Sequence, residues 1–300
     1  MRHPLSLASL GYGALRLIGV TAVARRLRNG GLVLCYHNVV PDGDPGAWGA
    51  LGLHMPFSTF ARQMRWLAAT YAVVPLDRLV EGVARRENLR GKAAVTFDDA
   101  YVGVFDYALP LLRELDLPAT VFVVAQAPGS GHDFWWDHPS VLRVYSDARR
   151  ERWLTQLRGD GTAIIASLDL NGDGPLRPPP ACRPADWPTI AAAARAGLSI
   201  GAHSATHRAL TTLGRFDLDT EVNDSREAIA RHTGVVPDVF AYPYGLSNEH
   251  VREVVRAAGY RAAFTLDRGH GPDAWSLGRL NVPAGISDAA FDAWTVGLHP

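Results

Sequence analysis

The feature that most constrains the fold of this chain is an alternation of short apolar runs with helical patterns from residue 31 onward. Residues 93–97 and 119–124 are apolar runs of strand length, and residues 104–115 between them carry leucines at helical spacing. Strands that alternate with helices pair in parallel, because the helix returns the chain to the same end of the sheet. The sequence therefore predicts an α/β fold. Further strands are expected at 31–36, 71–74, 198–202, 239–242 and 261–266, and further helices at 58–69 (with Ser58 as N-cap), 189–196, 219–232 and 248–258.

The stretch before residue 31 forms a separate N-terminal segment. Residues 5–24 are mostly apolar, Arg16 interrupts them, and three more arginines follow closely. A secretory signal carries its positive charges before an unbroken apolar centre, and a membrane-spanning helix needs about 20 mostly apolar residues. The pattern favours an amphipathic helix that packs on the protein or lies on a membrane surface, with a weak membrane anchor and a signal peptide as alternatives. We therefore expect a cytoplasmic or membrane-associated protein, with secretion as the open alternative.

Residues 127–186 break the strand–helix rhythm. The stretch opens rich in glycine and serine, ends rich in proline, and contains a basic segment of helical pattern at 140–157. It is too short and polar to build its own core, so we expect an insertion within one barrel domain of residues 31–300. An insertion of this kind either shapes access to a site or is a passive surface elaboration.

Charge and cysteine content exclude some function classes. Lys+Arg and Asp+Glu are equal at 30 each, so the formal net charge is zero. Proteins that bind nucleic-acid phosphates are usually basic, so we expect no nucleic-acid partner. Cys35 and Cys182 lie far apart, which argues against a disulfide framework and against a thiolate zinc site.

Two polar motifs follow predicted strands and carry the chemistry. Asp98 and Asp99 come directly after the run 93–97, and His203 and His207 lie four residues apart after the run 198–202. Two imidazoles and one carboxylate form a three-ligand face that leaves metal positions open for water and substrate. The second carboxylate is placed to act as a general base. The pattern indicates metal-assisted hydrolysis; the iron(II) oxygenases use the same ligand types but commonly as His-x-Asp with a distant histidine.

The expected strand ends bring further polar residues to the same place. His37 closes the first strand and Tyr244 follows the strand at 239–242. In parallel α/β folds the loops after the strands meet at one edge of the sheet, where ligands bind. We therefore expect four strands to deliver site residues to one face of the molecule.

Three segments resemble a known family. Residues 96–99 (Thr-Phe-Asp-Asp), 203–207 (His-Ser-Ala-Thr-His) and 240–245 (Phe-Ala-Tyr-Pro-Tyr-Gly) resemble, in this order, the first three motifs of the polysaccharide deacetylases, the NodB-homology group or carbohydrate esterase family 4. The resemblance covers about residues 31 to 285. It implies an irregular (β/α)7 barrel, a divalent metal and the removal of acetyl groups, mostly from N-acetylated sugars. Zinc is the first expected metal, with cobalt, nickel or manganese as alternatives.

The resemblance also implies roles for individual residues. It assigns Asp99, His203 and His207 to the metal, and Asp98 to the general base that takes the proton of the attacking water. Tyr244 is expected near the developing oxyanion, with its backbone N–H as donor and its ring lining the pocket.

The chain departs from the family pattern at two points. The arginine that normally holds the base is replaced by Ala241, and Arg279 is our first candidate for its substitute. The family's late Leu-x-His motif, which supplies the acid, is missing, and neither His270 nor His299 has a matching setting.

The acid is instead expected near the N-terminus. Residues 34–38 (Leu-Cys-Tyr-His-Asn) resemble an early segment of the subgroup that deacetylates exopolysaccharides such as poly-N-acetylglucosamine. That subgroup has a circularly permuted barrel, so the same permutation is expected here. The resemblance assigns the general acid to His37.

The substrate is expected to be a carbohydrate. Aromatic faces suit sugar rings, so Trp135 and Trp136 either stack on the substrate or anchor the insertion. The full set of expected substrate contacts is Pro243, Tyr242, Trp135, Trp136 and Arg279. The leading interpretation is a metal-dependent N-deacetylase of an N-acetylhexosamine-containing glycan or glycoconjugate. The alternatives are a deformylase or O-acetyl esterase acting on a lipid-linked or small sugar, and a catalytically degenerate carbohydrate-binding protein.

Overall fold

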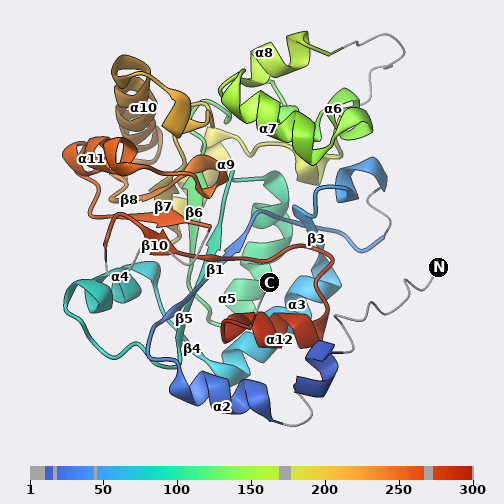
Figure 1. Cartoon of the computed structure of the whole chain (residues 1–300), viewed down its shortest axis with the longest axis vertical. Coiled ribbons are helices and arrows are strands. Elements are labelled where there is room, and N and C mark those ends of the chain that lie inside the picture. The colour runs from blue at the N-terminus through green and yellow to red at the C-terminus, as the bar shows by residue number, and fades with distance from the viewer. Residues whose placement is uncertain (1–10, 16–18, 44–45, 169–176, 267–272, 299–300) are drawn as a thin grey trace.

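A parallel sheet forms the centre of the molecule (Figure 1). The computed structural model describes residues 11–15, 19–43, 46–168, 177–266 and 273–298. The strands run in the order β10-β9-β8-β7-β6-β5-β1-β11, with β4 beside β5, and all pairs in this sheet are parallel. This confirms the predicted α/β class. The strands are β1 (Leu32–Tyr36), β4 (Ala72–Val73), β5 (Lys92–Phe97), β6 (Ala119–Val123), β7 (Ser199–Ala202), β8 (Val239–Ala241), β9 (Ala262–Thr265), β10 (Leu277–Gly278) and β11 (Leu280–Asn281).

One split strand nearly closes the sheet into a barrel. β10 pairs with β9 at one edge, and β11, which follows after a single residue, pairs with β1 at the other edge. The residue between them is Arg279. With β1, β5, β6, β7, β8 and β9, this split strand gives a barrel of the (β/α)7 type with one seam, as expected. The circular permutation stays a prediction.

Helices cover the sheet because each carries one apolar face. In α3, Phe60, Met64 and Leu67 recur at helical spacing and are fully buried. The predicted N-cap at Ser58 is wrong, since the helix begins after Pro56 and the Ser58 N–H donates to the side chain of Asp42. The helices of the barrel are α3 (Phe57–Thr70), α4 (Leu76–Ala84), α5 (Leu109–Glu114), α9 (Trp187–Arg195), α10 (Arg215–Thr233), α11 (Glu249–Ala257) and α12 (Asp288–Thr295).

The helix predicted at 104–115 has a distorted first turn. A π-helical turn, η2 (Val104–Ala108), precedes α5. Pro110 stands in the first turn of α5 and has no N–H to donate, so the regular hydrogen-bond pattern cannot run through this point. The Leu109 N–H instead reaches back five residues to the Val104 carbonyl.

The expected insertion leaves the sheet after β6 and caps one end of the barrel, at the top of Figure 1. The basic segment at 140–157 forms two helices, since Ser146 interrupts it and caps the second one through its side chain. Trp135 and Val141 join the main hydrophobic core. The division into one barrel domain with an insertion stays a prediction. Its helical turns are η3 (Trp135–Asp137), α6 (Pro139–Val144), α7 (Asp147–Thr155), α8 (Gly161–Ala166) and η4 (Pro180–Cys182).

The N-terminal helix α2 (Val20–Leu27) packs at the opposite end of the barrel, beside α12 (Figure 1). The Thr21 hydroxyl donates to Asp292 at 2.9 Å, and Arg25 forms an ion pair with the same carboxylate. This docking agrees with the packing alternative for the N-terminal segment, of which residues 1–10 and 16–18 lie outside the described part. Among the described helices, none has the length and apolar character that crossing a membrane requires.

Candidate metal centre and active site

The acidic pair lies in an unusual turn after β5. Asp99 and Ala100 adopt positive φ angles of 71° and 60°, a conformation that non-glycine residues rarely take. The turn directs the two neighbouring carboxylates to different partners. Asp98 pairs with Arg279, whereas Asp99 faces His203 and His207.

Asp99, His203 and His207 form a compact set of ligand atoms. The Asp99 Oδ1 lies 3.7 Å from His203 Nε2 and 3.5 Å from His207 Nε2, and the two Nε2 atoms are 3.2 Å apart. Ligand atoms about 2.1 Å from one zinc ion lie roughly 3.0–3.5 Å from one another. The His203 Nδ1 donates to the Ala241 carbonyl at 2.7 Å, which leaves the Nε2 lone pair free for a metal. The spacing therefore fits a divalent cation.

The electrostatics of this set fit the same cation. The Asp99 Oδ1 is buried without a hydrogen-bond partner, and burial, followed by the nearby carboxylates of Asp98 and Asp137, raises the pKa of Asp99 well above its usual range. Burial lowers the pKa of both His203 and His207, so their imidazoles are neutral at pH 7. Neutral imidazoles beside an uncompensated carboxylate are the donors that a metal requires.

Asp98 is held by Arg279 from the barrel seam. The two guanidinium nitrogens donate to the two carboxylate oxygens at 2.6 and 2.7 Å, and both side chains are completely buried. Burial alone would raise the pKa of Asp98, but the charge of the neighbouring Arg279 guanidinium holds it well below its usual range. Arg279 thus contacts Asp98 as the expected substitute for the replaced arginine would; its role in holding the base stays a prediction. Its burial against Asp98 corrects the expectation that it contacts substrate.

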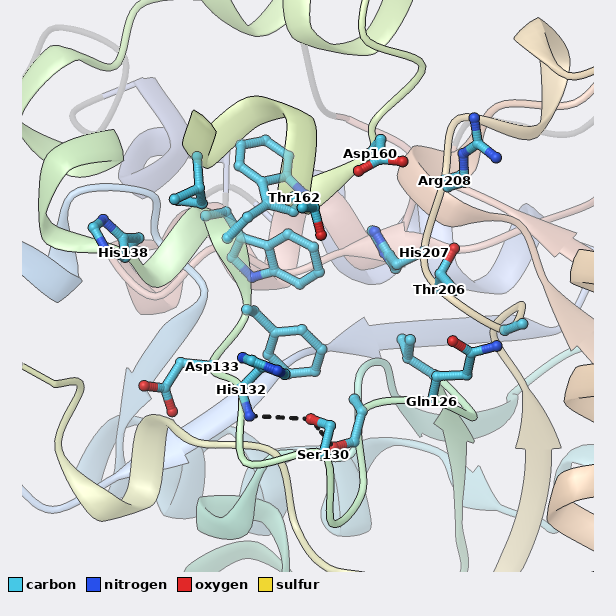
Figure 2. Close-up of a pocket in the computed structure, with 18 of the residues that line it drawn as sticks. Gln126, Ser130, His132, Asp133, His138, Asp160, Thr162, Thr206, His207 and Arg208 are labelled. Atoms are coloured by element: carbon cyan, nitrogen blue, oxygen red, sulfur yellow. Dashed lines mark hydrogen bonds between the residues drawn. The ribbon is translucent and has the colours of Figure 1, made fainter. Parts of the chain in front are cut away.

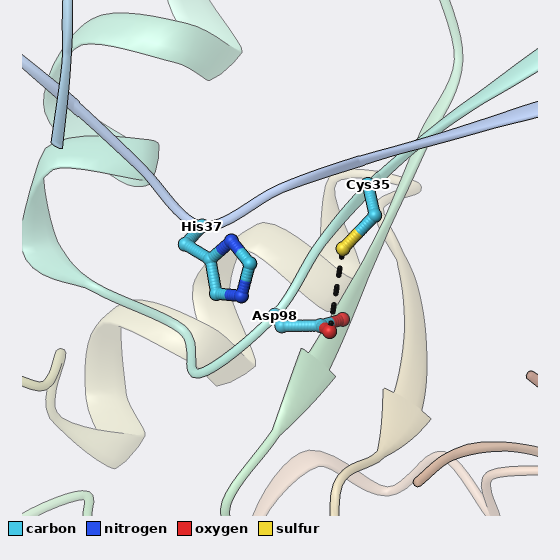
Figure 3. Close-up of side chains that lie close together, drawn as sticks. All are labelled: Cys35, His37 and Asp98. Atoms are coloured by element: carbon cyan, nitrogen blue, oxygen red, sulfur yellow. Dashed lines mark hydrogen bonds between the residues drawn. The ribbon is translucent and has the colours of Figure 1, made fainter. Parts of the chain in front are cut away.

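His37 and Cys35 lie close to Asp98 (Figure 3). Their ligand atoms and those of Asp98 all fall within 4.8 Å of one another, and the Cys35 thiol donates to Asp98 Oδ2 at 3.4 Å. Burial lowers the pKa of His37 to about 4, although the charge of Asp98 opposes the shift. His37 is therefore neutral at pH 7. The structure places it beside the expected base, as the resemblance implied; its acid role stays a prediction.

Tyr244 lies against the metal ligands after β8. It has a positive φ of 60°, its ring centroid is 4.6 Å from that of His207, and its hydroxyl donates to the His207 carbonyl at 3.0 Å. Tyr242 and Pro243, which precede it, are both buried. The Tyr242 hydroxyl donates to the Trp275 carbonyl at 2.8 Å, so this side chain packs in the core instead of facing a substrate.

A pocket of about 910 Å³ opens between the insertion and the loop that carries His207 (Figure 2). Trp135 and Trp136 contribute to its wall, but only 8% and 6% of their surfaces are exposed. The indole N–H of Trp136 donates to the Tyr101 hydroxyl, and its ring packs on His207. The burial favours anchoring of the insertion over stacking on sugar rings. His270 and His299 lie outside the described residues.

Sequence reasoning missed Glu221 in α10. Its carboxylate accepts the backbone N–H groups of Ala205 and Thr206 at 3.0 and 2.9 Å and also the Thr206 hydroxyl. The loop it holds carries His203 and His207 and contains two positive φ angles of 65° and 62°. A signal was present, since Glu221 stands beside an apolar residue on the buried face of a predicted helix, where a lone charge needs a partner.

Comparisons with known proteins agree with this geometry. A family model described as polysaccharide deacetylase matches residues 85–263. The Bacillus subtilis protein YxkH, named for the same family, is 20% identical over 87% of this chain and 75% of its own length. IcaB from Ammonifex degensii has a similar structure, with a TM-score of 0.62 and 22% identity over 90% of this chain and 98% of IcaB. A de-N-acetylase from Aggregatibacter actinomycetemcomitans also has a TM-score of 0.62, with 17% identity over 88% of this chain and 99% of that protein. The match to the family model spans more than half of the sequence, and the chain therefore belongs to the polysaccharide deacetylase family.

Proposed function

We propose that the protein is a metal-dependent carbohydrate N-deacetylase that hydrolyses the acetamide of an N-acetylhexosamine-containing glycan or glycoconjugate. The observation that carries the proposal is the separation of the two neighbouring carboxylates. Asp99 faces two neutral imidazoles, whereas Asp98 is kept apart and ionised by Arg279. A hydrolase needs both parts, a cation site and an independent proton acceptor.

Asp99, His203 and His207 would hold the cation, for which zinc is the first candidate because it favours nitrogen and oxygen donors of this kind. Deacetylases of this family depend on a metal. When bound, the metal polarises the acetyl carbonyl and lowers the pKa of a water molecule.

Asp98 accepts the proton of the attacking water in this proposal. Arg279 fixes both oxygens of its carboxylate and keeps it ionised, so the base is oriented before substrate arrives. The leaving amine needs a proton in turn, and His37 lies beside Asp98. Because His37 is neutral at pH 7, it must receive a proton before it can donate one to the amine. In this proposal that proton is the one that Asp98 takes from the attacking water. The backbone N–H of Tyr244 is proposed to face the developing oxyanion.

An O-acetyl esterase is the second candidate. A histidine with a pKa of about 4 is a strong acid that is rarely protonated at neutral pH. An alcohol leaves an ester with less help from an acid than an amine needs to leave an amide. A neutral His37 is compatible with an ester substrate, whereas the structural likeness to a de-N-acetylase supports amides.

The test uses the zinc- or cobalt-loaded protein with N-acetylated and O-acetylated oligosaccharides and lipid-linked sugars. Products are identified by mass spectrometry, and released acetate is measured separately. Asp98→Asn serves as the control, because it keeps the volume of the side chain but cannot accept the proton. We expect acetate from N-acetylated substrates, and a rate about 10²- to 10⁴-fold lower with Asp98→Asn at full metal content. Acetate from esters alone would move the assignment to the esterase, and formate from formylated sugars to the deformylase. A fully loaded wild-type protein that binds glycans but releases no acid would indicate a binding protein.

A further inference from the structure

The two histidines of the candidate metal site are oriented in different ways. His203 is fixed by the hydrogen bond from its Nδ1 to the Ala241 carbonyl. The corresponding Nδ1 of His207 is buried without a hydrogen-bond partner. An imidazole that lacks such a bond is free to rotate about its χ2 angle unless packing stops it. The orientation of His207 must therefore come from the rings around it.

Two aromatic side chains pack on His207, in addition to the His203 imidazole, whose ring centroid lies 4.7 Å away. The centroid of Trp136 lies 4.5 Å from that of His207 with an interplanar angle of 51°, and Tyr244 lies 4.6 Å away at 78°. Tyr244 belongs to the barrel, whereas Trp136 belongs to the insertion. The insertion thus supplies one of the ring surfaces that pack on a proposed metal ligand.

Trp136 is itself held by a directional chain of hydrogen bonds. Its indole N–H, which can only donate, reaches the Tyr101 hydroxyl oxygen at 2.7 Å. The Tyr101 hydroxyl then donates to Asp137 Oδ2 at 2.6 Å, and His54 Nε2 donates to Asp137 Oδ1 at 2.9 Å. Tyr101, Asp137 and His54 are all at most 1% exposed.

This chain of bonds connects both loops that carry metal ligands. Tyr101 stands two residues after Asp99, in the same turn with positive φ angles. Trp136 contacts His207 on the other loop. The segment of Trp136 and Asp137 therefore links the aspartate loop to the histidine loop. His54 in β3 (His54–Pro56) links both to a separate two-stranded sheet, in which β3 pairs with β2 (Asn38–Val40).

We propose that Trp136, Tyr101 and Asp137 are positioning residues of the metal centre, and that the insertion is a part of the metal site. The inference rests on the proposed metal function of Asp99, His203 and His207. Outer partners that orient metal ligands change metal affinity by about 10- to 100-fold when they are removed. The same loss is expected here, although none of the three residues would touch the metal.

The experiment compares Trp136→Phe and Tyr101→Phe with the wild type. Trp136→Phe removes the indole N–H and reduces the ring on His207, and Tyr101→Phe removes a single oxygen from the chain of bonds. The matched control is Trp153→Phe, an equally buried insertion tryptophan that packs on Trp135 and Tyr145. Zinc affinity is measured by competition with a chromophoric chelator, ligand geometry by the visible spectrum of the cobalt-substituted protein, and stability by thermal unfolding without metal.

We expect zinc binding about 10- to 100-fold weaker in Trp136→Phe and Tyr101→Phe, together with a changed cobalt spectrum. Trp153→Phe should lower the melting temperature but leave zinc affinity and the spectrum as in the wild type. Wild-type affinity and spectrum in both test variants would overturn the inference, because the contacts would then only stabilise the insertion. Should Trp136→Phe fail to fold, Tyr101→Phe decides alone. A wild-type protein that binds neither zinc nor cobalt would instead refute the proposed metal function.

Discussion

Replacement of Arg279 by methionine tests how the base is held. Both side chains of the Asp98–Arg279 pair are buried, with two N–H···O contacts of 2.6 and 2.7 Å. Methionine fills a similar volume but leaves the carboxylate without a counter-charge. Loss of one partner from a buried pair costs about 3–5 kcal/mol, because the remaining charge stays desolvated. We therefore expect Arg279→Met to lose about 3–5 kcal/mol of unfolding free energy at pH 7.

The loss should depend on pH with a defined sign. In the wild type the pKa of Asp98 is depressed, so its contribution to stability is present above the unfolded pKa and disappears as the pH falls. In Arg279→Met burial is unopposed by the arginine and raises the pKa of Asp98 above its unfolded value. The carboxyl then becomes protonated as the pH falls, which relieves the uncompensated charge. The stability difference between the two proteins should accordingly shrink from about pH 7 towards about pH 4.

Urea unfolding followed by circular dichroism measures these free energies at several pH values. Arg279→Lys is the matched control, since it keeps the charge but cannot bind both carboxylate oxygens, and it should lie between the other two proteins. The double variant Asp98→Asn/Arg279→Met should be more stable than Arg279→Met, because it also removes the unpaired charge. The acid limb of the kcat/KM profile should move to higher pH in Arg279→Met. A stability within about 1 kcal/mol of the wild type, together with an unmoved acid limb, would show that Arg279 does not hold the base.

Three further predictions concern other parts of the site. His203→Ala and Asp99→Ala should lose bound zinc by elemental analysis, and added zinc should no longer raise their melting temperature; retained zinc in both would exclude this ligand set. His37→Ala should keep its zinc but lose about 10²- to 10⁴-fold in rate, and a rate equal to the wild type between about pH 6 and pH 9 would exclude the acid role. Glu221→Gln should cost about 1–3 kcal/mol and weaken zinc binding, because one carboxylate accepts three donors in the ligand loop; Glu227→Gln, exposed on the same helix, is its control, and equal effects of both would contradict the assignment.

Local irregularities mark where sequence patterns were misleading. The leucine spacing at 104–115 predicted one regular helix, but Pro110 imposes a π-helical turn at its start. The helix at 140–157 became two because Ser146 caps a new helix. β10 and β11 have two residues each, too few to show a period.

The sequence by itself determined the class of the fold and the identity of the reactive groups. Strand and helix periods reflect which side chains of a short segment are buried, so β5, β6 and α3 could be located from local patterns. The two aspartates are adjacent and the two histidines lie four residues apart, and the strand before each pair brings both pairs to one edge of the sheet. A metal site with a neighbouring general base could therefore be predicted from the sequence.

The tertiary structure alone decided which residues hold these groups in place. Arg279 binds Asp98 across 181 positions, Glu221 reaches the histidine loop from a helix, and Trp136 packs on His207 from the insertion. The sequence offered Arg279 only as a first candidate, and it indicated that Glu221 needs a partner without identifying that partner, because no local period encodes contacts between distant segments. Closure of the barrel at the split strand places Arg279 beside Asp98, and docking of the insertion places Trp136 beside His207. Both side chains are buried, so their N–H groups must find hydrogen-bond acceptors within the protein.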